Sequence, residues 1–196
     1  LSINNKTITD SEFSIEFQEI PNELIIQANT IGSILTNIRL EISYINSISS
    51  LINNLENSRI NNSFIRGNIQ GTYITAPLVG YATNNLELNN SFNDANITGK
   101  YITSGLIGVM ENASTNMGSI YNSGNISGES YSGGIIGAVY SSYNINIHDS
   151  FNTGTIQGNV KGSIVGTSEI DIIDHNNYYT NENINPVGNN NSISAT

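Results

Sequence analysis

The residue types that could catalyse a reaction are scarce in this chain, and one short segment brings three of them together. His148, Asp149 and Ser150 are consecutive and are the residue types of a Ser–His–Asp triad. In a strand, adjacent side chains point to opposite faces, so His148 and Asp149 could not meet there as general base and orienting carboxylate. We therefore assign no catalytic residue in this segment.

The carboxylates offer one candidate ion site and no candidate active site. Asp171, Asp174 and His175 form a compact acidic group that could bind Ca²⁺, although a solvated loop is the favoured interpretation. A hydrolase or lyase would need carboxylates converging on one face. The remaining candidates fall in different phases of the repeat described below: Glu87, Asp94, Glu111, Glu129 and Asp149. We expect no metal, no cofactor and no enzymatic activity.

Seven N-x-Ser/Thr sequons could accept N-linked glycans in a secreting eukaryote, but about seven are expected by chance in a chain with 34 Asn. Asn89 and Asn112 lie in looser segments and are the favoured acceptors, followed by Asn61 and Asn5. Asn96 and Asn125 are expected inside a ladder of stacked side chains, where a glycosyltransferase could not reach them.

Composition and charge exclude several classes of partner. The formal net charge is −10 with only 6 basic residues, which argues against binding to nucleic acid or to an anionic membrane. No apolar run approaches the roughly 18 residues of a membrane-spanning helix. The chain has no Cys, so disulfides and thiolate metal sites are excluded. Its 33 Ile and 10 Tyr argue against disorder.

The apolar residues recur with a period of 27 to 30 residues. One ladder contains Ile15, Ile42, Ile69, Ile97, Ile126, Ile156 and Ile184. A second contains Leu24, Leu51, Leu78, Leu106, Ile135 and Ile164. An aromatic ladder in the same frame contains Phe64, Phe92, Tyr121, Phe151 and Tyr179. Such a fixed period is typical of repeat architectures.

Within each repeat, apolar and polar residues alternate with period 2, which predicts strands; a short helix within residues 31–55 is the one competing interpretation. About three short strands per repeat would form one coil of a parallel β-solenoid, and coils would stack about 4.8 Å apart. We predict an all-β fold of six to seven coils. Residues 1–61 would be degenerate coils, 62–166 regular repeats, and 167–196 a last partial coil with a polar tail.

In-register stacking also accounts for the polar residues. Asn can donate and accept at once, so stacked Asn side chains form hydrogen-bonded ladders. The candidate ladders are Asn68, Asn96 and Asn125, followed by Thr155, and Asn93, Asn122 and Asn152. Like charges in neighbouring coils would repel each other, and the column Arg66, Asp94, Ser123 and Thr153 avoids this. Ice binding would need a regular column of Thr. Thr75 and Thr103 occupy one aligned position, but Ser132 and Lys161 follow them there, so the column is not regular.

Two recurring motifs resemble the GLUG-motif repeats of secreted and surface proteins. Residues 105–108 read Gly-Leu-Ile-Gly, and residues 149–158 read Asp-Ser-Phe-Asn-Thr-Gly-Thr-Ile-Gln-Gly. The clear resemblance covers about residues 62–166. It implies a right-handed parallel β-helix of the kind found in adhesins, stalks and non-catalytic regions of large secreted proteins, and it carries no catalytic residue.

The expected function is therefore that of a non-catalytic extracellular or cell-surface structural protein. It would be a stalk, an adhesin segment or a fibre-forming subunit, stacked end to end on adjacent repeats or on other copies of itself. The alternatives are a carbohydrate-binding module and an accessory region of a larger secreted enzyme. Exposed tyrosines would contact glycans in the carbohydrate-binding alternative: Tyr140, Tyr143, Tyr178 and Tyr179.

Overall fold

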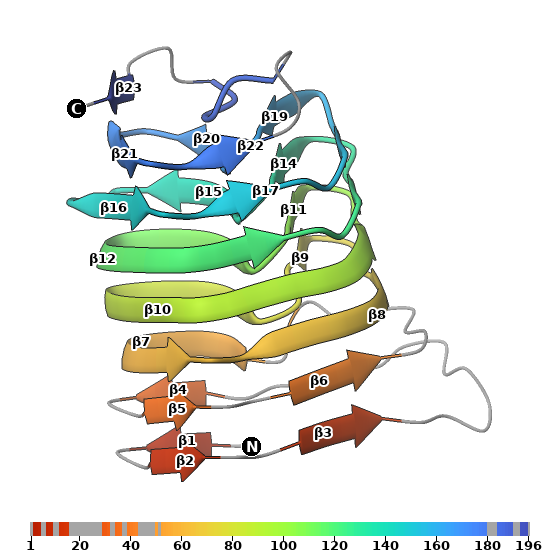
Figure 1. Ribbon diagram of the computed structural model, residues 1–196, viewed down its shortest axis with the longest axis vertical. Coiled ribbons are helices and arrows are strands. Elements are labelled where there is room, and N and C mark those ends of the chain that lie inside the picture. Colours follow the sequence, from red (N-terminus) through yellow and green to blue (C-terminus); the bar gives the residue numbers. More distant parts are fainter. Residues whose placement is uncertain are drawn as a thin grey trace.

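The fold is an all-β parallel solenoid whose successive turns stack along the long axis (Figure 1). The computed structural model describes residues 2–4, 7–9, 12–15, 29–31, 34–36, 39–42, 50, 52–179, 184–189 and 193–195. Every regular element among these residues is a strand, including the part of 31–55 where a helix was the competing interpretation. The predicted fold class is confirmed.

One large parallel sheet wraps around the turns, and a smaller parallel sheet lies beside it. The first strands of the large sheet are β1 (Ser2–Asn4), β2 (Thr7–Thr9), β3 (Glu12–Ile15), β4 (Asn29–Ile31), β5 (Ile34–Thr36), β6 (Arg39–Ile42), β7 (Ile52–Asn61) and β8 (Phe64–Gln70). The central ones are β10 (Val79–Thr98), β12 (Ile107–Asn122), β13 (Ile126–Ser127), β15 (Ile136–Tyr140), β16 (Ile145–His148), β17 (Phe151–Asn152) and β18 (Ile156–Gln157). The last are β20 (Val165–Ser168), β21 (Ile172–His175), β22 (Tyr178–Tyr179) and β23 (Ile193–Ala195).

The smaller sheet consists of β9 (Ile74–Thr75), β11 (Ile102–Ser104), β14 (Tyr131–Gly133) and β19 (Val160–Gly162). Each of these strands comes from one of four successive turns, so about four turns carry strands in both sheets. Among the described residues this is fewer than the six to seven coils expected, although seven strands of the large sheet pair in series: β1, β4, β7, β10, β12, β15 and β20.

Strand pairing places residues of the same kind above one another. Ile69 pairs with Ile97, Ile97 with Ile126, and Ile126 with Ile156. These four are at most 4% exposed. A second buried column is at most 2% exposed: Leu78, Leu106, Ile135 and Ile164. Burial of one such side chain contributes about 1.5–3 kcal/mol, so the stacked interior is the main source of stability.

Two rungs differ from the ladders predicted by sequence. Ile42 pairs with Gly67 and not with Ile69, because that turn is shorter than its neighbours. Phe151 pairs with Tyr178, so Tyr178 continues the aromatic column and Tyr179 packs against the core. The predicted rungs at Leu24 and Leu51 lie outside the described residues.

A recurring corner explains the Asn-Ser-Phe motif. The first residue of the motif has a positive φ, which Asn and Asp tolerate better than most residues. The five stacked corner residues have φ between 50° and 55°: Asn62, Asn90, Ser119, Asp149 and Asn176. Where a serine follows, at Ser63, Ser91 and Ser150, it is buried, and the Ser91 hydroxyl accepts from the Ser63 backbone N–H of the preceding turn. The corner therefore ties neighbouring turns together.

Candidate functional site

A column of amides lies inside the solenoid. The Asn93 Nδ2 donates to Asn122 Oδ1 at 2.7 Å, and the Asn122 Nδ2 donates to Asn152 Oδ1 at 2.7 Å. All three side chains are at most 1% exposed. Asn122 also donates to the Gly124 carbonyl at 3.0 Å. A buried amide is stable only when hydrogen-bonded, so this column is a structural element without access for a ligand.

Gly105, which opens Gly-Leu-Ile-Gly, and its counterpart Gly134 pack against this amide column. A Cβ at Gly105 would lie 2.1 Å from the Gly134 carbonyl oxygen and 3.0 Å from the Asn122 side chain. A Cβ at Gly134 would meet the Asn152 side chain in the same way. The glycine of one recurring motif therefore packs against the buried Asn of the other recurring motif.

A second amide ladder lies on the surface. The Asn96 Nδ2 donates to Asn68 Oδ1 at 3.4 Å, the Asn125 Nδ2 to Asn96 Oδ1 at 3.2 Å, and the Thr155 hydroxyl to Asn125 Oδ1 at 2.6 Å. The predicted ladder is therefore present, but Asn96 and Asn125 are exposed, so the expectation that a glycosyltransferase could not reach them is wrong. They stand on the opposite strand face from the buried Ile69 and Ile97 column.

The aromatic ladder leaves few ring faces free. The rings of Phe64 and Phe92 are stacked with centroids 5.0 Å apart and planes 4° apart, and those of Tyr121 and Phe151 are 4.2 Å apart. Stacked rings cover each other's faces, and a sugar normally packs on an open face. Tyr178, which pairs with Phe151, is 64% exposed. The ladder is therefore better suited to holding turns in register than to binding a glycan.

The tyrosines that were candidates for glycan contact differ in exposure. Tyr143 and Tyr178 are 56% and 64% exposed, whereas Tyr140 is only partly exposed and Tyr179 packs against the core. Burial raises the pKa of Tyr140, and the nearby Tyr131 raises it further.

Two arginines are paired with carboxylates in the neighbouring turn. The Arg59 Nε lies 2.5 Å from one Glu87 carboxylate oxygen, and the Arg59 Nη2 donates to the other at 2.8 Å. This bidentate contact lowers the pKa of Glu87 and raises the pKa of Arg59. Arg66 and Asp94 form a looser pair at 3.6 Å. Both pairs are about half exposed, so each contributes little to stability.

The segment with triad residue types does not form a triad, although the reason differs from the one predicted. The His148 Nδ1 lies 2.9 Å from Asp149 Oδ2, so the expectation that these side chains could not meet is wrong. Asp149 is a corner residue with φ 50°, and the corner turns its carboxylate back toward the imidazole. The Ser150 hydroxyl is buried and donates to the His148 carbonyl at 2.8 Å. The potential nucleophile is therefore separate from the potential base.

The candidate Ca²⁺ group lies mostly outside the side chains that the structure describes. Asp171 is exposed, and the side chains of Asp174 and His175 lie outside the described part of the chain. The part of the chain that the structure describes contains no group of three His, Cys, Asp or Glu side chains placed to hold a metal ion.

The favoured sequons occupy different environments. Asn112 is exposed and sits on a corner with φ 49°. Asn89 is half-buried, and its Oδ1 accepts from the Gly118 backbone N–H at 3.2 Å. Asn61 is also half-buried, and Asn5 lies outside the described residues. Asn112 is thus the most accessible of the three predicted acceptors that the structure describes.

Thr75, Thr103 and Ser132 are fully buried and their hydroxyls have no hydrogen-bond partner. Strand pairing stacks them in one column that continues to the exposed Lys161. A Cβ at Gly99 would lie 2.3 Å from the Thr103 hydroxyl, so the glycine backbone covers this oxygen closely. The column is closed to ligands, and a Thr surface for ice is absent at these positions.

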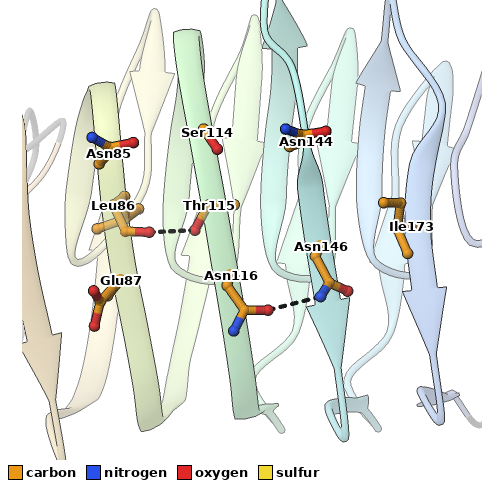
Figure 2. Close-up of a pocket in the computed structure, with 9 residues that line it drawn as sticks. All are labelled: Asn85, Leu86, Glu87, Ser114, Thr115, Asn116, Asn144, Asn146 and Ile173. Carbon is orange, nitrogen blue, oxygen red and sulfur yellow. Dashed lines mark hydrogen bonds between the residues drawn. The ribbon is translucent and has the colours of Figure 1, made fainter.

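A shallow groove of about 480 Å³ lies across the outer face of β10, β12, β16 and β21 (Figure 2). Its lining residues are Asn85, Leu86, Glu87, Ser114, Thr115, Asn116, Asn144, Asn146 and Ile173. Within it the Asn146 Nδ2 donates to Asn116 Oδ1 at 2.7 Å. Sequence reasoning missed this groove, although Asn116 and Asn146 fall one period apart, 30 residues, and pair in register.

Comparison with solved structures gives only remote likeness. No family profile matches this chain, and no curated protein matches it. Among solved structures, it is similar to a proposed immunoglobulin A1 protease from Bacteroides ovatus, with 13% identity and a TM-score of 0.42. The alignment covers 97% of this chain and 72% of that one. A likeness this remote carries no inference about activity.

Proposed function

We propose that this chain is a non-catalytic structural segment of an extracellular or cell-surface protein. It would act as a rigid stalk, adhesin segment or fibre-forming unit that stacks end to end on adjacent repeats or on other copies of itself. The extracellular location rests on the resemblance to GLUG-motif repeats. Among the described residues, no helix is long and apolar enough to cross a membrane.

The observation that carries the proposal is the continuity of the stacking. Apolar, aromatic and amide columns each run through successive turns, and the amide column passes hydrogen bonds from Asn93 to Asn152 through the interior. Bending the solenoid would break contacts in every column at once. Such an arrangement supports a mechanical role, because load is shared among all walls of the rod.

The residues of triad type at 148–150 make contacts within their own corner of the solenoid. Ser150 is committed to the His148 carbonyl, and the imidazole contacts an exposed carboxylate instead. A structural segment needs none of these groups for chemistry.

End-to-end association can be tested on the purified chain. The strands β1, β2 and β3 pair on one side only among the described residues. Negative-stain electron microscopy and sedimentation should show rods that lengthen with protein concentration. Ile8→Pro should shorten them, because proline removes a backbone donor from the edge strand β2, whereas Ile8→Val should not. Dispersed single particles at every concentration would overturn the fibre-forming version.

The stalk version is tested by pulling on the two ends of the chain with an atomic force microscope. We expect extension steps that correspond to one turn of the solenoid, about 29 residues. Smooth extension at low force would contradict a load-bearing role.

A further inference from the structure

Two exposed tyrosines, Tyr73 and Tyr101, stack on each other where the strands of the smaller sheet begin. Their ring centroids lie 5.1 Å apart and their planes are 13° apart. Tyr73 is 71% exposed and Tyr101 is 52% exposed, so solvent reaches both phenols. Tyr121 differs, because the rings that it contacts in the aromatic ladder belong to Phe92 and Phe151. The pair therefore brings two accessible phenols together.

Backbone pairing holds the two tyrosines in this register. Tyr73 directly precedes β9 and Tyr101 directly precedes β11, which are neighbours in the smaller sheet (Figure 1). Ile74 pairs with Ile102 in these strands, and the Ile102 N–H donates to the Tyr73 carbonyl at 2.8 Å. Paired strands lie about 4.8 Å apart, so the two side chains start from almost the same separation as their rings. The fold therefore fixes the stack.

Two phenols held this closely are suited to oxidative coupling, because proximity converts a bimolecular step into an intramolecular one. A one-electron oxidant removes one electron and one proton from each phenol O–H and leaves two phenoxyl radicals. One ring carbon next to each hydroxyl, a Cε atom, joins its counterpart in a C–C bond. The hydrogen on each joined carbon then moves to the phenol oxygen and restores the aromatic ring. Exposed side chains change rotamer rapidly, so the stacked rings can turn their Cε edges together.

A bond at this place would link two neighbouring turns covalently. The chain has no Cys, so disulfides cannot join its turns. A bond between Tyr73 and Tyr101 closes a loop that runs once around the solenoid. A cross-link that closes such a loop stabilises a fold mainly by restricting the unfolded chain. Coupling should therefore raise the temperature at which these turns unfold.

We propose that Tyr73 and Tyr101 are a modification site at which a haem peroxidase and hydrogen peroxide form an intrachain dityrosine. One hydrogen peroxide takes up the two electrons and two protons that the phenols release, and becomes two water molecules. The product is a covalent bond between the turns that carry β9 and β11. This site is independent of the stalk or fibre role, since it needs only one folded chain.

The test oxidises the whole chain, at low protein concentration, with a haem peroxidase and hydrogen peroxide. The monomer isolated by size-exclusion chromatography should show dityrosine fluorescence and should lose the mass of two hydrogen atoms. Trypsin cleaves after Lys and Arg, and Lys100 lies between the two tyrosines. Uncoupled chains should therefore give separate peptides of residues 67–100 and 101–161, whereas coupled chains should give one joined species. Tandem mass spectra of the joined species should assign the bond to Tyr73 and Tyr101.

Tyr73→Phe and Tyr101→Phe each remove one phenol and keep the stacked ring, so each should reduce the joined species to background. The matched control, Tyr143→Phe, removes a phenol that is 56% exposed and comes from a different part of the turn. It should leave the yield of the joined species unchanged. Oxidation should raise the midpoint of thermal unfolding of the parent chain and of the control, but not of Tyr101→Phe. Circular dichroism before oxidation monitors the fold of each variant.

Four results would overturn the proposal. The first is that the oxidised monomer contains no joined species. The second is that tandem mass spectra assign the bond to other tyrosines. The third is that Tyr143→Phe lowers the yield as much as Tyr101→Phe does. The fourth is an equal yield from the chain unfolded in urea, since the stack in the fold would then play no part.

Discussion

At the residue scale, stability depends on amides that are buried and still hydrogen-bonded. Asn122 accepts from Asn93 and donates to Asn152 and to the Gly124 carbonyl. Replacing it leaves a donor on one side and an acceptor on the other without partners. The exposed Asn125 makes similar ladder contacts, but water can replace them.

We therefore expect Asn122→Ala to lower the free energy of unfolding by about 2–4 kcal/mol, because each unsatisfied buried group costs about 1–3 kcal/mol. Asn125→Ala, its exposed counterpart, should cost about 0.5 kcal/mol or less. Urea unfolding followed by circular dichroism measures both values. If both variants lost the same free energy of unfolding, burial of the amide column would not contribute to stability.

At the element scale, in-register pairing places residues of the same type directly above and below each other. Each residue type must therefore be compatible with copies of itself in the neighbouring strands. Asn96 and Asn125 lie in adjacent turns and face outward. Two lysines there would stand about 4.8 Å apart in backbone position, and like charges directly opposite in a sheet repel each other. This constraint is a physical reason for the low charge of the chain.

A double-mutant cycle tests this repulsion. Asn96→Lys combined with Asn125→Lys should be less stable than the two single changes predict, by about 0.2–1 kcal/mol. Asn96→Lys with Asn125→Glu should show a coupling energy of opposite sign. Both couplings should shrink in 1 M salt. Purely additive effects at low salt would contradict in-register repulsion.

The contact between β7 and β10 made by Arg59 and Glu87 predicts a dependence on pH. The guanidinium lowers the pKa of Glu87, so the contact stabilises the fold above the ordinary glutamate pKa of about 4.3. That stabilisation is lost as the pH falls through the lowered folded-state pKa. Glu87→Gln should thus be slightly less stable than the parent at pH 7 and equal to it near pH 2. Chemical unfolding at both pH values measures the difference in stability between Glu87→Gln and the parent. If that difference is the same at pH 2 as at pH 7, the ion pair is not its cause.

At the scale of the whole molecule, a solenoid is a stack in which each turn contacts mainly its neighbours. Deleting residues 107–135 removes one period and joins Leu106 to Ile136, which keeps every column in register. Leu106 then takes the place of Ile135, its neighbour in the same buried column. The molecule should lose one turn and keep its fold.

We expect this deletion to leave a cooperative unfolding transition with a lower midpoint and an unchanged β-type circular dichroism spectrum per residue. Deleting residues 107–120, about half a turn, should destroy the register and abolish cooperative unfolding. If both deletions behave alike, the turns are not interchangeable units.

Much of the fold could be predicted from sequence because stacking repeats itself along the chain. Ile69, Ile97, Ile126 and Ile156 fill one buried column, so their spacing reports the length of each turn directly. The amides at Asn93 and Asn122 are recognisable for the same reason. Period and strand type follow from local alternation, which needs no knowledge of distant contacts.

The details that depend on corners and on the choice of face could not be predicted in this way. Asp149 contacts His148 because a corner with positive φ replaces the straight strand that the sequence suggested. Tyr178 takes the aromatic position because one turn is a residue shorter than assumed.

The sequence by itself determined the period, the strands and the residues that stack, because in-register repetition makes every column visible as a recurring residue type. The tertiary structure alone decided which amides are buried, which corner brings a histidine to a carboxylate, and where a groove opens across four strands. Those features arise from how the walls of successive turns face each other and the solvent, and no single repeat contains that information.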